Sequence, residues 1–558
     1  MKLRGRTYAI FGILAVVLIG GWVLFQNYWY YIPGYIADFK DPIAAPHAVT
    51  WGAGPETASV PVSERPPNIV LILADDMGFN DITANGGGVA GGLVPTPNID
   101  SIAKSGVRFV NGYAGNATCA PSRAAIMTGR YATRFGFEFT PTPKGFMKLV
   151  STFDPGRHKP IYRADLEDQI PPVAVQAVPR SEIMLPEALK KQGYRTLFFG
   201  KWHLGEAKQF RMESRGFDDA LGFSRGASLY LPKGDPRGVE SHQEFDPIDR
   251  FLWANLRFAV TFNNSQRFQP PEYMTDYLGK EAVKAIHANR NRPFFMYFAS
   301  NAPHTPLQAL KSDYDALPQI KNHTLRVYGA MIRALDRNVG RILQALKDEG
   351  LDQNTLVIFT SDNGGADYLG LPDINKPYRG WKLTFFEGGI HVPFFMKWPG
   401  KIPAGEVYPN AVAHVDIFST ALAAAGGQIP TDRVMDGVNL LPYVEPAAEG
   451  AAPEGTPHKT LFWRSRTYRA MIEGDWKIQS SEIPKKIWLY DLKTDPTEHH
   501  NLADSDPGKV KELLATMMQI DRKQAKPLWP SLGDGPVDID HPLSVPEKPG
   551  DEYIYWSN

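Results

Sequence analysis

Short hydrophobic runs alternate with longer amphipathic segments along the chain from residue 68 onward. Four runs are rich in β-branched or aromatic residues, as buried strands are, and we predict strands at 68–74, 195–200, 293–299 and 355–360. Apolar residues at helical spacing predict helices at 185–193, 274–289 and 325–350. Strands that alternate with helices indicate an α/β domain whose mostly parallel central sheet is flanked by helices.

The pattern changes after residue 426. The segments beyond it indicate antiparallel strands joined by turns and then one helix, which together form a smaller C-terminal α+β unit. We therefore expect five regions: an N-terminal anchor or signal segment, a linker that packs partly on the domain, the α/β domain, the α+β subdomain and an irregular, proline-rich tail. Their boundaries are 1–33, 34–66, 67–426, 427–525 and 526–558.

The first 33 residues combine a basic start with a long apolar run. Three basic residues precede an uncharged, mainly apolar stretch from Tyr8 to Phe25, and an aromatic cluster follows it. A membrane-spanning helix needs about 17–25 such residues, and its basic flank stays in the cytoplasm. We expect an uncleaved membrane anchor with the folded domains on the periplasmic or extracytoplasmic side. The alternative is a signal peptide whose cleavage releases a secreted protein, although its apolar core is usually about 7–15 residues long.

The net charge and the cysteine count limit the kinds of partner and metal site that the chain can have. The 558 residues carry no formal net charge, which gives no indication of a nucleic-acid partner, so any recognition of anions must be local. A single cysteine excludes disulfides within the chain and cysteine-based zinc fingers. No pattern in the sequence sets an oligomeric state.

Polar residues follow each of the four predicted strands at once. The carboxyl ends of parallel strands lie at one edge of a sheet, where ligands bind in open α/β folds. We therefore expect these residues to converge on one site: Asp75, Asp76, Lys201, His203, His304, Asp362 and Asn363.

Two carboxylate-rich pairs stand out among these strand ends. Asp75–Asp76 and Asp362–Asn363 offer only oxygen ligands, and crowded carboxylates repel each other unless a cation lies between them. All-oxygen coordination favours Ca²⁺, or secondarily Mg²⁺, over zinc. The simpler interpretation of either pair alone is that it caps the helix after its strand.

Five basic residues are candidates to surround a tetrahedral anion. Lysine and arginine neutralise anionic charge, and histidine transfers protons near neutral pH. Each one taken singly is more often an ordinary surface or core residue, and only their shared placement favours a site. They are Arg123, Lys201, His203, His304 and Lys382.

The only cysteine, Cys119, lies in the stretch TCAPSRAAIMTGR. Pro121 suits the first turn of a helix and Gly129 its end, so Cys119 is predicted at a helix N-terminus. The helix dipole there lowers the pKa of a thiol, which suits a thiolate nucleophile. A buried core cysteine is the alternative.

These motifs resemble a known enzyme family. C-x-P-S-R followed by a helix that ends in T-G-R is similar to the signature of the formylglycine-dependent sulfatases, which are arylsulfatase-like members of the alkaline phosphatase superfamily. Further motifs occur in the family's order from residue 68 to 503, among them NIVLILADDMGFND, GKWHLG, APHTP, SDNGG and KLTFFEGGIHVPF. The resemblance implies an alkaline-phosphatase-like fold and a sulfuric ester hydrolase.

The resemblance also implies roles for individual residues. Cys119 is converted to 3-oxoalanine (formylglycine) by a formylglycine-generating enzyme, and Arg123 steadies the hydrated aldehyde. A divalent cation, usually Ca²⁺, is held by the formylglycine oxygen and by Asp75, Asp76, Asp362 and Asn363. Sulfate binding and proton transfer fall to Lys201, His203, His304 and Lys382, with Lys201, His304 and Lys382 as the substrate-binding residues.

The expected substrate is an aryl or carbohydrate sulfate ester, as a small molecule or an oligosaccharide. Segment 206–275 is rich in aromatic and basic residues and is a candidate for the leaving-group side. Two alternatives stay open. The same scaffold could hydrolyse phosphomonoesters or phosphonate monoesters, since both anions are tetrahedral, or the chain could bind sulfated glycans without catalysis.

Overall fold

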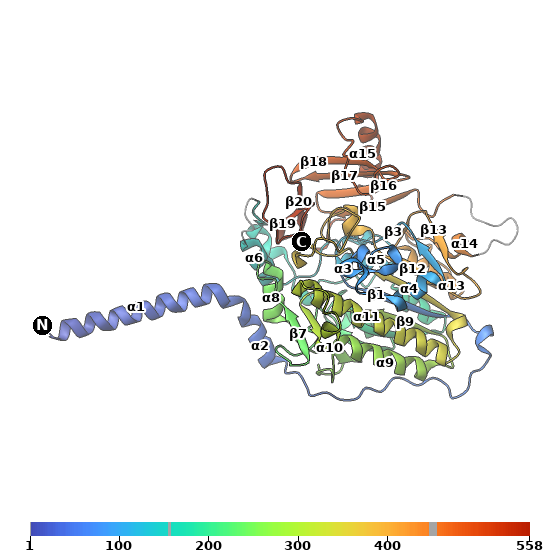
Figure 1. The fold of residues 1–558 in the computed structure, drawn as a ribbon, viewed down its shortest axis with the longest axis horizontal. Coiled ribbons are helices and arrows are strands. Elements are labelled where there is room, and N and C mark those ends of the chain that lie inside the picture. The colour runs from blue at the N-terminus through green and yellow to red at the C-terminus, as the bar shows by residue number, and fades with distance from the viewer. Residues whose placement is uncertain (1, 154–157, 446–454) are drawn as a thin grey trace.

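A computed structural model describes residues 2–153, 158–445 and 455–558. Helix α1 (Lys2–Tyr28) extends away from the body that the rest of the chain forms (Figure 1). Within the described residues, no single helix is long and apolar enough to cross a membrane, so the expected single spanning helix is not supported. A bent pair, Ile10–Phe25 with Trp29–Ala37 at 58°, passes the same test by length and composition alone.

The central sheet has nine strands. Five neighbours in the middle, β11-β1-β9-β5-β6, all run parallel, while β12 and β8 run antiparallel to the strands beside them. In spatial order the strands are β13 (Glu406–Tyr408), β2 (Val107–Phe109), β12 (Phe394–Lys397), β11 (Thr355–Ser361), β1 (Asn68–Ala74), β9 (Phe294–Ala299), β5 (Arg195–Lys201), β6 (Asp219–Phe223) and β8 (Thr261–Phe262). The predicted mostly parallel α/β sheet is confirmed.

The four predicted strands are β1, β5, β9 and β11, and they lie next to one another in the sheet. In β1 every residue is buried, which explains its uninterrupted apolar run. Its alternate side chains enter different cores, with Val70 and Ile72 on one face and Ile69 and Leu71 on the other.

Helices cover both faces of the sheet. Apolar residues of α4 (Pro97–Lys104), α9 (Met274–Asn289) and α11 (His323–Asp348) share the core of Val70. The opposite core, which contains Ile69, is covered by α5 (Cys119–Thr128), α7 (Leu185–Lys191) and α13 (Asp416–Ala424). The chain therefore buries a three-layer α/β core, and the carboxyl ends of the parallel strands form one shared edge.

The C-terminal unit is an antiparallel sheet that carries one helix. Strands β15 (Thr460–Ser465), β16 (Tyr468–Glu473), β17 (Trp476–Glu482) and β18 (Lys485–Asp491) pair in sequence order, and α15 (Pro507–Asp521) packs on one face. The other face meets the large domain, where Trp463 and Trp488 share a core with Phe385. The predicted α+β unit is confirmed.

The expectation of an irregular tail is wrong. Strands β19 (Gly533–Asp538) and β20 (Tyr553–Ser557) pair antiparallel, and β4 (Ile161–Tyr162) adds a third strand. Val537, Ile554 and Trp556 are buried in the core that joins the C-terminal unit to the large domain. Burial of these apolar side chains outweighs the low strand propensity of the surrounding prolines and glycines.

A buried ion triad spans the contact between the two units. The Lys477 ammonium lies 2.7 Å from a carboxylate oxygen of Glu387 and 2.9 Å from one of Glu498, and all three side chains are buried. Glu387 belongs to the large domain and follows Lys382 by five residues. The triad therefore connects the C-terminal sheet to the segment that carries a predicted site lysine.

We expect Lys477→Met to lower the free energy of unfolding by about 3 kcal/mol or more, because it leaves buried carboxylates without a counter-charge. Lys459→Met is the matched control, since the Lys459 side chain is 87% exposed. Urea denaturation of both variants measures the difference. Equal effects of the two substitutions would show that the triad does not stabilise the contact.

Candidate active site

The structure brings all ten predicted site residues to the carboxyl edge of the central sheet. Asp75 and Asp76 follow β1, Lys201 ends β5, and the other strand-end residues lie in the loops after β5, β9 and β11. Helix α5 contributes Cys119 and Arg123, and Lys382 enters from the loop before Glu387. All ten are buried: Asp75, Asp76, Cys119, Arg123, Lys201, His203, His304, Asp362, Asn363 and Lys382. Their chemical roles stay predictions.

Asp75 and Asp362 each form an ion pair with a buried basic side chain. The Lys201 ammonium lies 2.8 Å from each carboxylate oxygen of Asp75. Arg123 donates from Nε to Asp362 at 2.8 Å, and its Nη2 lies 3.5 Å from Asp75. Burial, together with the charge of Asp75, raises the pKa of Asp362 to about 6.

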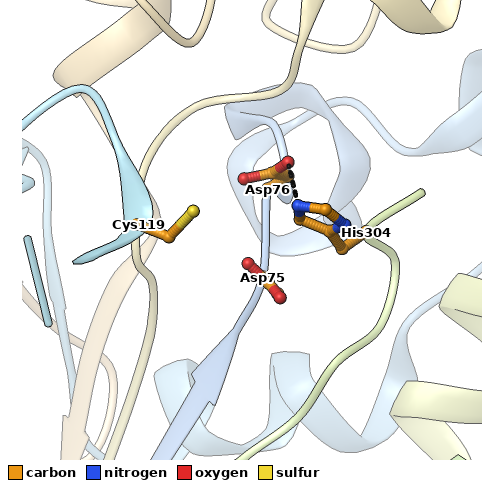
Figure 2. A group of neighbouring side chains, drawn as sticks. All are labelled: Asp75, Asp76, Cys119 and His304. Atoms are coloured by element: carbon orange, nitrogen blue, oxygen red, sulfur yellow. Dashed lines mark ion pairs between the residues drawn. The ribbon is translucent and has the colours of Figure 1, made fainter. Parts of the chain in front are cut away.

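Asp76 is the most highly connected carboxylate of the site. It lies in the left-handed region at φ 60°, which is uncommon outside glycine and is found at functional sites. Lys382 Nζ approaches its Oδ2 at 2.6 Å, Asn363 Nδ2 donates to its Oδ1 at 2.8 Å, and His304 Nε2 lies 3.5 Å away (Figure 2). Burial raises the pKa of Asp76, but Lys382, His304 and Lys201 outweigh it and hold that pKa well below its usual range.

Burial lowers the pKa of both site histidines. Burial and the nearby ammonium of Lys201 lower the pKa of His203 far below its ordinary value. Burial also lowers the pKa of His304 to about 3, although Asp76 opposes the shift. His304 Nδ1 lies 2.5 Å from the Thr305 carbonyl and donates to it, so Nε2 is the nitrogen that faces Asp76, at 3.5 Å.

Cys119 begins α5, as predicted, and Gly129 caps the helix in the left-handed conformation at φ 68°. Its side chain points toward Asp75 and Asp76, and the ligand atoms of Asp75, Asp76, Cys119 and His304 all lie within 4.8 Å of one another (Figure 2). Burial raises the pKa of the thiol despite Lys201 and Lys382. This shift opposes the lowering that the helix N-terminus predicts for an unmodified thiol.

The donor set fits a hard divalent cation. The carboxylates of Asp75 and Asp76 lie in one group of close ligand atoms, and Asp362 accepts from the backbone N–H of Asp76 at 3.1 Å. Asn363 donates from Nδ2 to Asp76, while its Oδ1 is buried and has no hydrogen-bond partner. An orphaned buried oxygen among carboxylates is what a cation ligand requires. Cys119 and His304 have ligand atoms within 4.8 Å of those of Asp75 and Asp76. The predicted metal set contained Cys119, as its formylglycine, but not His304.

Two residues that the sequence analysis missed support the site. The Tyr368 hydroxyl donates to Asp76 at 3.1 Å and accepts from Lys382 at 3.0 Å. The His414 ring lies 3.0 Å from both Ser122 of α5 and Thr360 of β11, so it fixes the helix of Cys119 against the sheet. His414 lies in a conspicuous HVDIFS motif, whereas no spacing rule singles out Tyr368.

Gly226 fixes the position of the His203 ring. A Cβ at Gly226 would lie 2.7 Å from both Cε1 and Nε2 of that ring, a distance that real side chains do not tolerate. We expect Gly226→Ala to displace His203 and to reduce kcat/KM by about 100-fold, the cost typical of a small misplacement of a reacting group. Gly535→Ala, where a Cβ meets nothing within 4 Å, is the control. The measurement is kcat/KM for sulfate release by both variants. An unchanged kcat/KM in Gly226→Ala would show that Gly226 does not fix the position of the His203 ring.

This fold, with buried acidic and basic side chains at the carboxyl edge of a mostly parallel sheet, defines a class of protein, the hydrolases of the alkaline phosphatase superfamily. Comparison with known proteins agrees. The family model described as Sulfatase matches residues 67–427, and the model for the C-terminal part of N-sulphoglucosamine sulphohydrolase matches residues 380–525.

Individual relatives extend this result. N-acetylgalactosamine-6-sulfatase of Mus musculus is 34% identical over 419 residues, which are 74% of this chain and 72% of the relative. The crystal structure of Ps i-CgsB in complex with k-i-k-neocarrahexaose is 30% identical, with a TM-score of 0.67 over 83% of this chain and 95% of that one. Phosphonate monoester hydrolase of Agrobacterium radiobacter, at 21% identity and a TM-score of 0.54 over 82% and 95%, shares the fold. The chain belongs to the sulfatase family and is a sulfuric ester hydrolase.

Proposed function

We propose that this enzyme hydrolyses a sulfate ester of a saccharide through a formylglycine made from Cys119, with a bound Ca²⁺ ion. One observation carries the proposal. Cys119, inside a C-x-P-S-R motif, begins a buried helix and lies beside Asp75, Asp76 and His304, which come from neighbouring strand ends. A structural cysteine needs none of these groups around it.

The proposed cation ligands are Asp75, Asp76, Asp362 and Asn363. Their oxygens favour Ca²⁺ over metals that prefer nitrogen or sulfur ligands. When bound, the cation neutralises carboxylate charge and polarises an oxygen at position 119. A hydrated aldehyde at that position supplies one hydroxyl to attack sulfur and a second through which sulfate can be expelled.

The basic residues neutralise the charge of the sulfate group and move protons. Lys201 and Lys382 each lie within 2.8 Å of a carboxylate, so both ammonium groups are held in place before substrate binds. His304, assisted by Lys382, is the proposed donor to the departing alcohol, and His203 is the proposed acceptor of the proton whose loss releases sulfate. Both histidines are buried, which keeps water away from the reacting groups.

Modification must precede folding in this proposal. Cys119 is only 4% exposed in the folded chain, so a formylglycine-generating enzyme cannot reach it without opening the core. The modifying enzyme is therefore a proposed partner of the unfolded or nascent chain. Export is also proposed, because an N-terminal apolar segment precedes the folded domains. A chain with a single cysteine cannot form wrong internal disulfides in an oxidising compartment.

Substrate chemistry separates this proposal from its alternatives. Comparing initial rates on an aryl sulfate and the corresponding aryl phosphate tests it, with faster sulfate release expected. Preference for the phosphate or for a phosphonate monoester would instead favour the activity named for the Agrobacterium structure, which shares only the fold. Affinity for sulfated glycans without any turnover would favour a binding protein.

A further inference from the structure

A second group of metal-ligating side chains lies in the C-terminal tail, outside the candidate active site. It joins Asp538, the last residue of β19, to His541 and Asp551 of the loop that leads to β20. A ligand atom of each residue lies within 4.8 Å of those of the other two. Within the described part of the chain, only this group and the one around Cys119 bring three such side chains so close. We call it the tail cluster.

The distances inside the tail cluster match those between two ligands of one metal ion. His541 Nε2 lies 2.8 Å from Asp551 Oδ2 and 3.4 Å from Asp538 Oδ2. Zinc binds nitrogen and carboxylate oxygen at about 2.0–2.2 Å, so two of its ligands at a tetrahedral angle are about 3.4 Å apart, and closer at a smaller angle. The imidazole is therefore at ligand distance from both carboxylates.

One carboxylate oxygen of the tail cluster has no hydrogen-bond partner. The Asp538 side chain is only 10% exposed, and its Oδ2 is buried and unpartnered. The other oxygen, Oδ1, accepts from the backbone N–H groups of Asp540 and His541 at 3.0 and 3.2 Å, which holds the carboxylate in place. A buried carboxylate oxygen without a donor is costly, and a cation bound to it removes that cost.

The donor set of the tail cluster indicates the class of ion. An imidazole nitrogen beside two carboxylates suits zinc, whereas the all-oxygen set proposed for the active site suits calcium. Three protein ligands leave a fourth position for water. His541 and Asp551 are partly exposed, so an ion and its water can reach the cluster from solvent.

The tail cluster lies at the two ends of a long connection. Residues 539–552 join β19 to β20, whereas hairpin loops usually have 2–5 residues. This loop contacts the large domain, because the Leu543 amide donates to the Asp367 carbonyl at 3.2 Å and Arg379 donates to Asp540 at 2.8 Å. Asp367 and Arg379 belong to the segment after β11 that also carries the site lysine. A link between the ends of the loop therefore restrains a support of the candidate active site.

We propose that the tail cluster binds one Zn²⁺ ion, which holds the two ends of the 539–552 loop together. Asp538 and Asp551 each supply one carboxylate oxygen, His541 supplies Nε2, and water completes the coordination. The ion takes the place of any proton on Nε2, so binding weakens as the pH falls. Its role is structural, and the proposal does not depend on the reaction at Cys119.

Calorimetric titration of the full chain with zinc tests the proposal. Excess calcium is present, and a zinc ion bound at the candidate active site would titrate alike in every variant. His541→Gln should weaken binding at the tail cluster by about 100-fold or more, since even outer-shell partners of a metal contribute about 10- to 100-fold. Asp551→Asn should show the same loss and covers the case in which His541→Gln folds poorly. His500→Gln is the matched control, because His500 is an exposed histidine that pairs with Asp495 at 3.6 Å.

Limited proteolysis reads the loop itself. A glutamate-specific protease cuts after Glu547 when the loop opens, and zinc at ten times its dissociation constant should slow that cut about tenfold in the wild-type protein. In His541→Gln the same zinc concentration should leave the rate unchanged. Equal zinc affinity in the wild type, His541→Gln and Asp551→Asn would overturn the proposal and identify the cluster as a plain histidine–carboxylate contact. A wild-type cleavage rate that zinc does not change would also overturn it.

Discussion

Replacing Cys119 by alanine is expected to reduce sulfate release by more than about 10³-fold, the scale on which enzymes lose activity with their nucleophile. The substitution removes one buried sulfur atom at the start of α5 and leaves the ion pairs of Asp75, Asp76 and Asp362 intact. The thermal midpoint should therefore stay within about 4 °C of the wild-type value. Continuous sulfate-release assays and thermal unfolding of the same preparations provide the two readings.

Two outcomes would contradict this expectation. Residual activity within tenfold of wild type would show that another group attacks sulfur. A large drop in the thermal midpoint would show that Cys119 is chiefly a core residue, which is the alternative that its burial alone suggests. Gly535→Ala, which changes an open position far along the chain, controls for handling of the variants.

Withdrawing the cation is expected to abolish activity and to lower stability together. Three buried carboxylates and the orphaned Asn363 oxygen form the proposed all-oxygen ligand set. An ion present at 100 times its dissociation constant stabilises the folded state by about 2.7 kcal/mol, which a chelator removes. Calcium should restore both activity and thermal midpoint more fully than magnesium. Ca²⁺ accepts irregular coordination by protein oxygens, whereas Mg²⁺ demands near-ideal octahedral geometry.

The same titration on Asp362→Asn provides the matched comparison. This variant loses one ligand charge, so it should need more calcium to recover its thermal midpoint than the wild-type enzyme does. Elemental analysis of purified protein reads the bound ion directly. Full activity in protein that holds no divalent ion, or equal calcium dependence of both proteins, would contradict the proposed metal centre.

The sheet core was predictable because its strands are buried on both faces. NIVLILA and TLVIFT are continuous apolar runs, and they became β1 and β11, paired in register from Asn68 and Thr355. Sequence patterns do not set the order of strands, however. That β9 lies between β1 and β5 depends on tertiary packing, although the motif positions required these strands to share an edge.

The proposed site was predictable for the same topological reason. Residues directly after parallel strands meet at one edge, so Asp75, Lys201 and Asp362 needed no knowledge of side-chain contacts. Tyr368 escaped prediction because it reaches Asp76 from a short 3-10 turn that carries no periodic signal.

The tail was predicted wrongly because its local composition disfavours strands, whereas its strands form through distant contacts. Prolines and glycines from residue 526 onward argue against strands, yet Pro536 lies within β19, in a small sheet with β20 and β4. Its partner β4 lies more than 350 residues earlier in the chain. Pairing over that separation cannot be read from a local window.

Mass spectrometry of the tryptic peptide 109–123 tests the central claim most directly. This peptide contains Cys119, the only cysteine of the chain, and should be isolated from protein produced together with a formylglycine-generating enzyme. We predict an aldehyde in place of the thiol, together with loss of the single thiol that titrates in the denatured chain and sulfate release in proportion to the modified fraction. A fully active preparation whose peptide carries only unmodified cysteine would contradict the account.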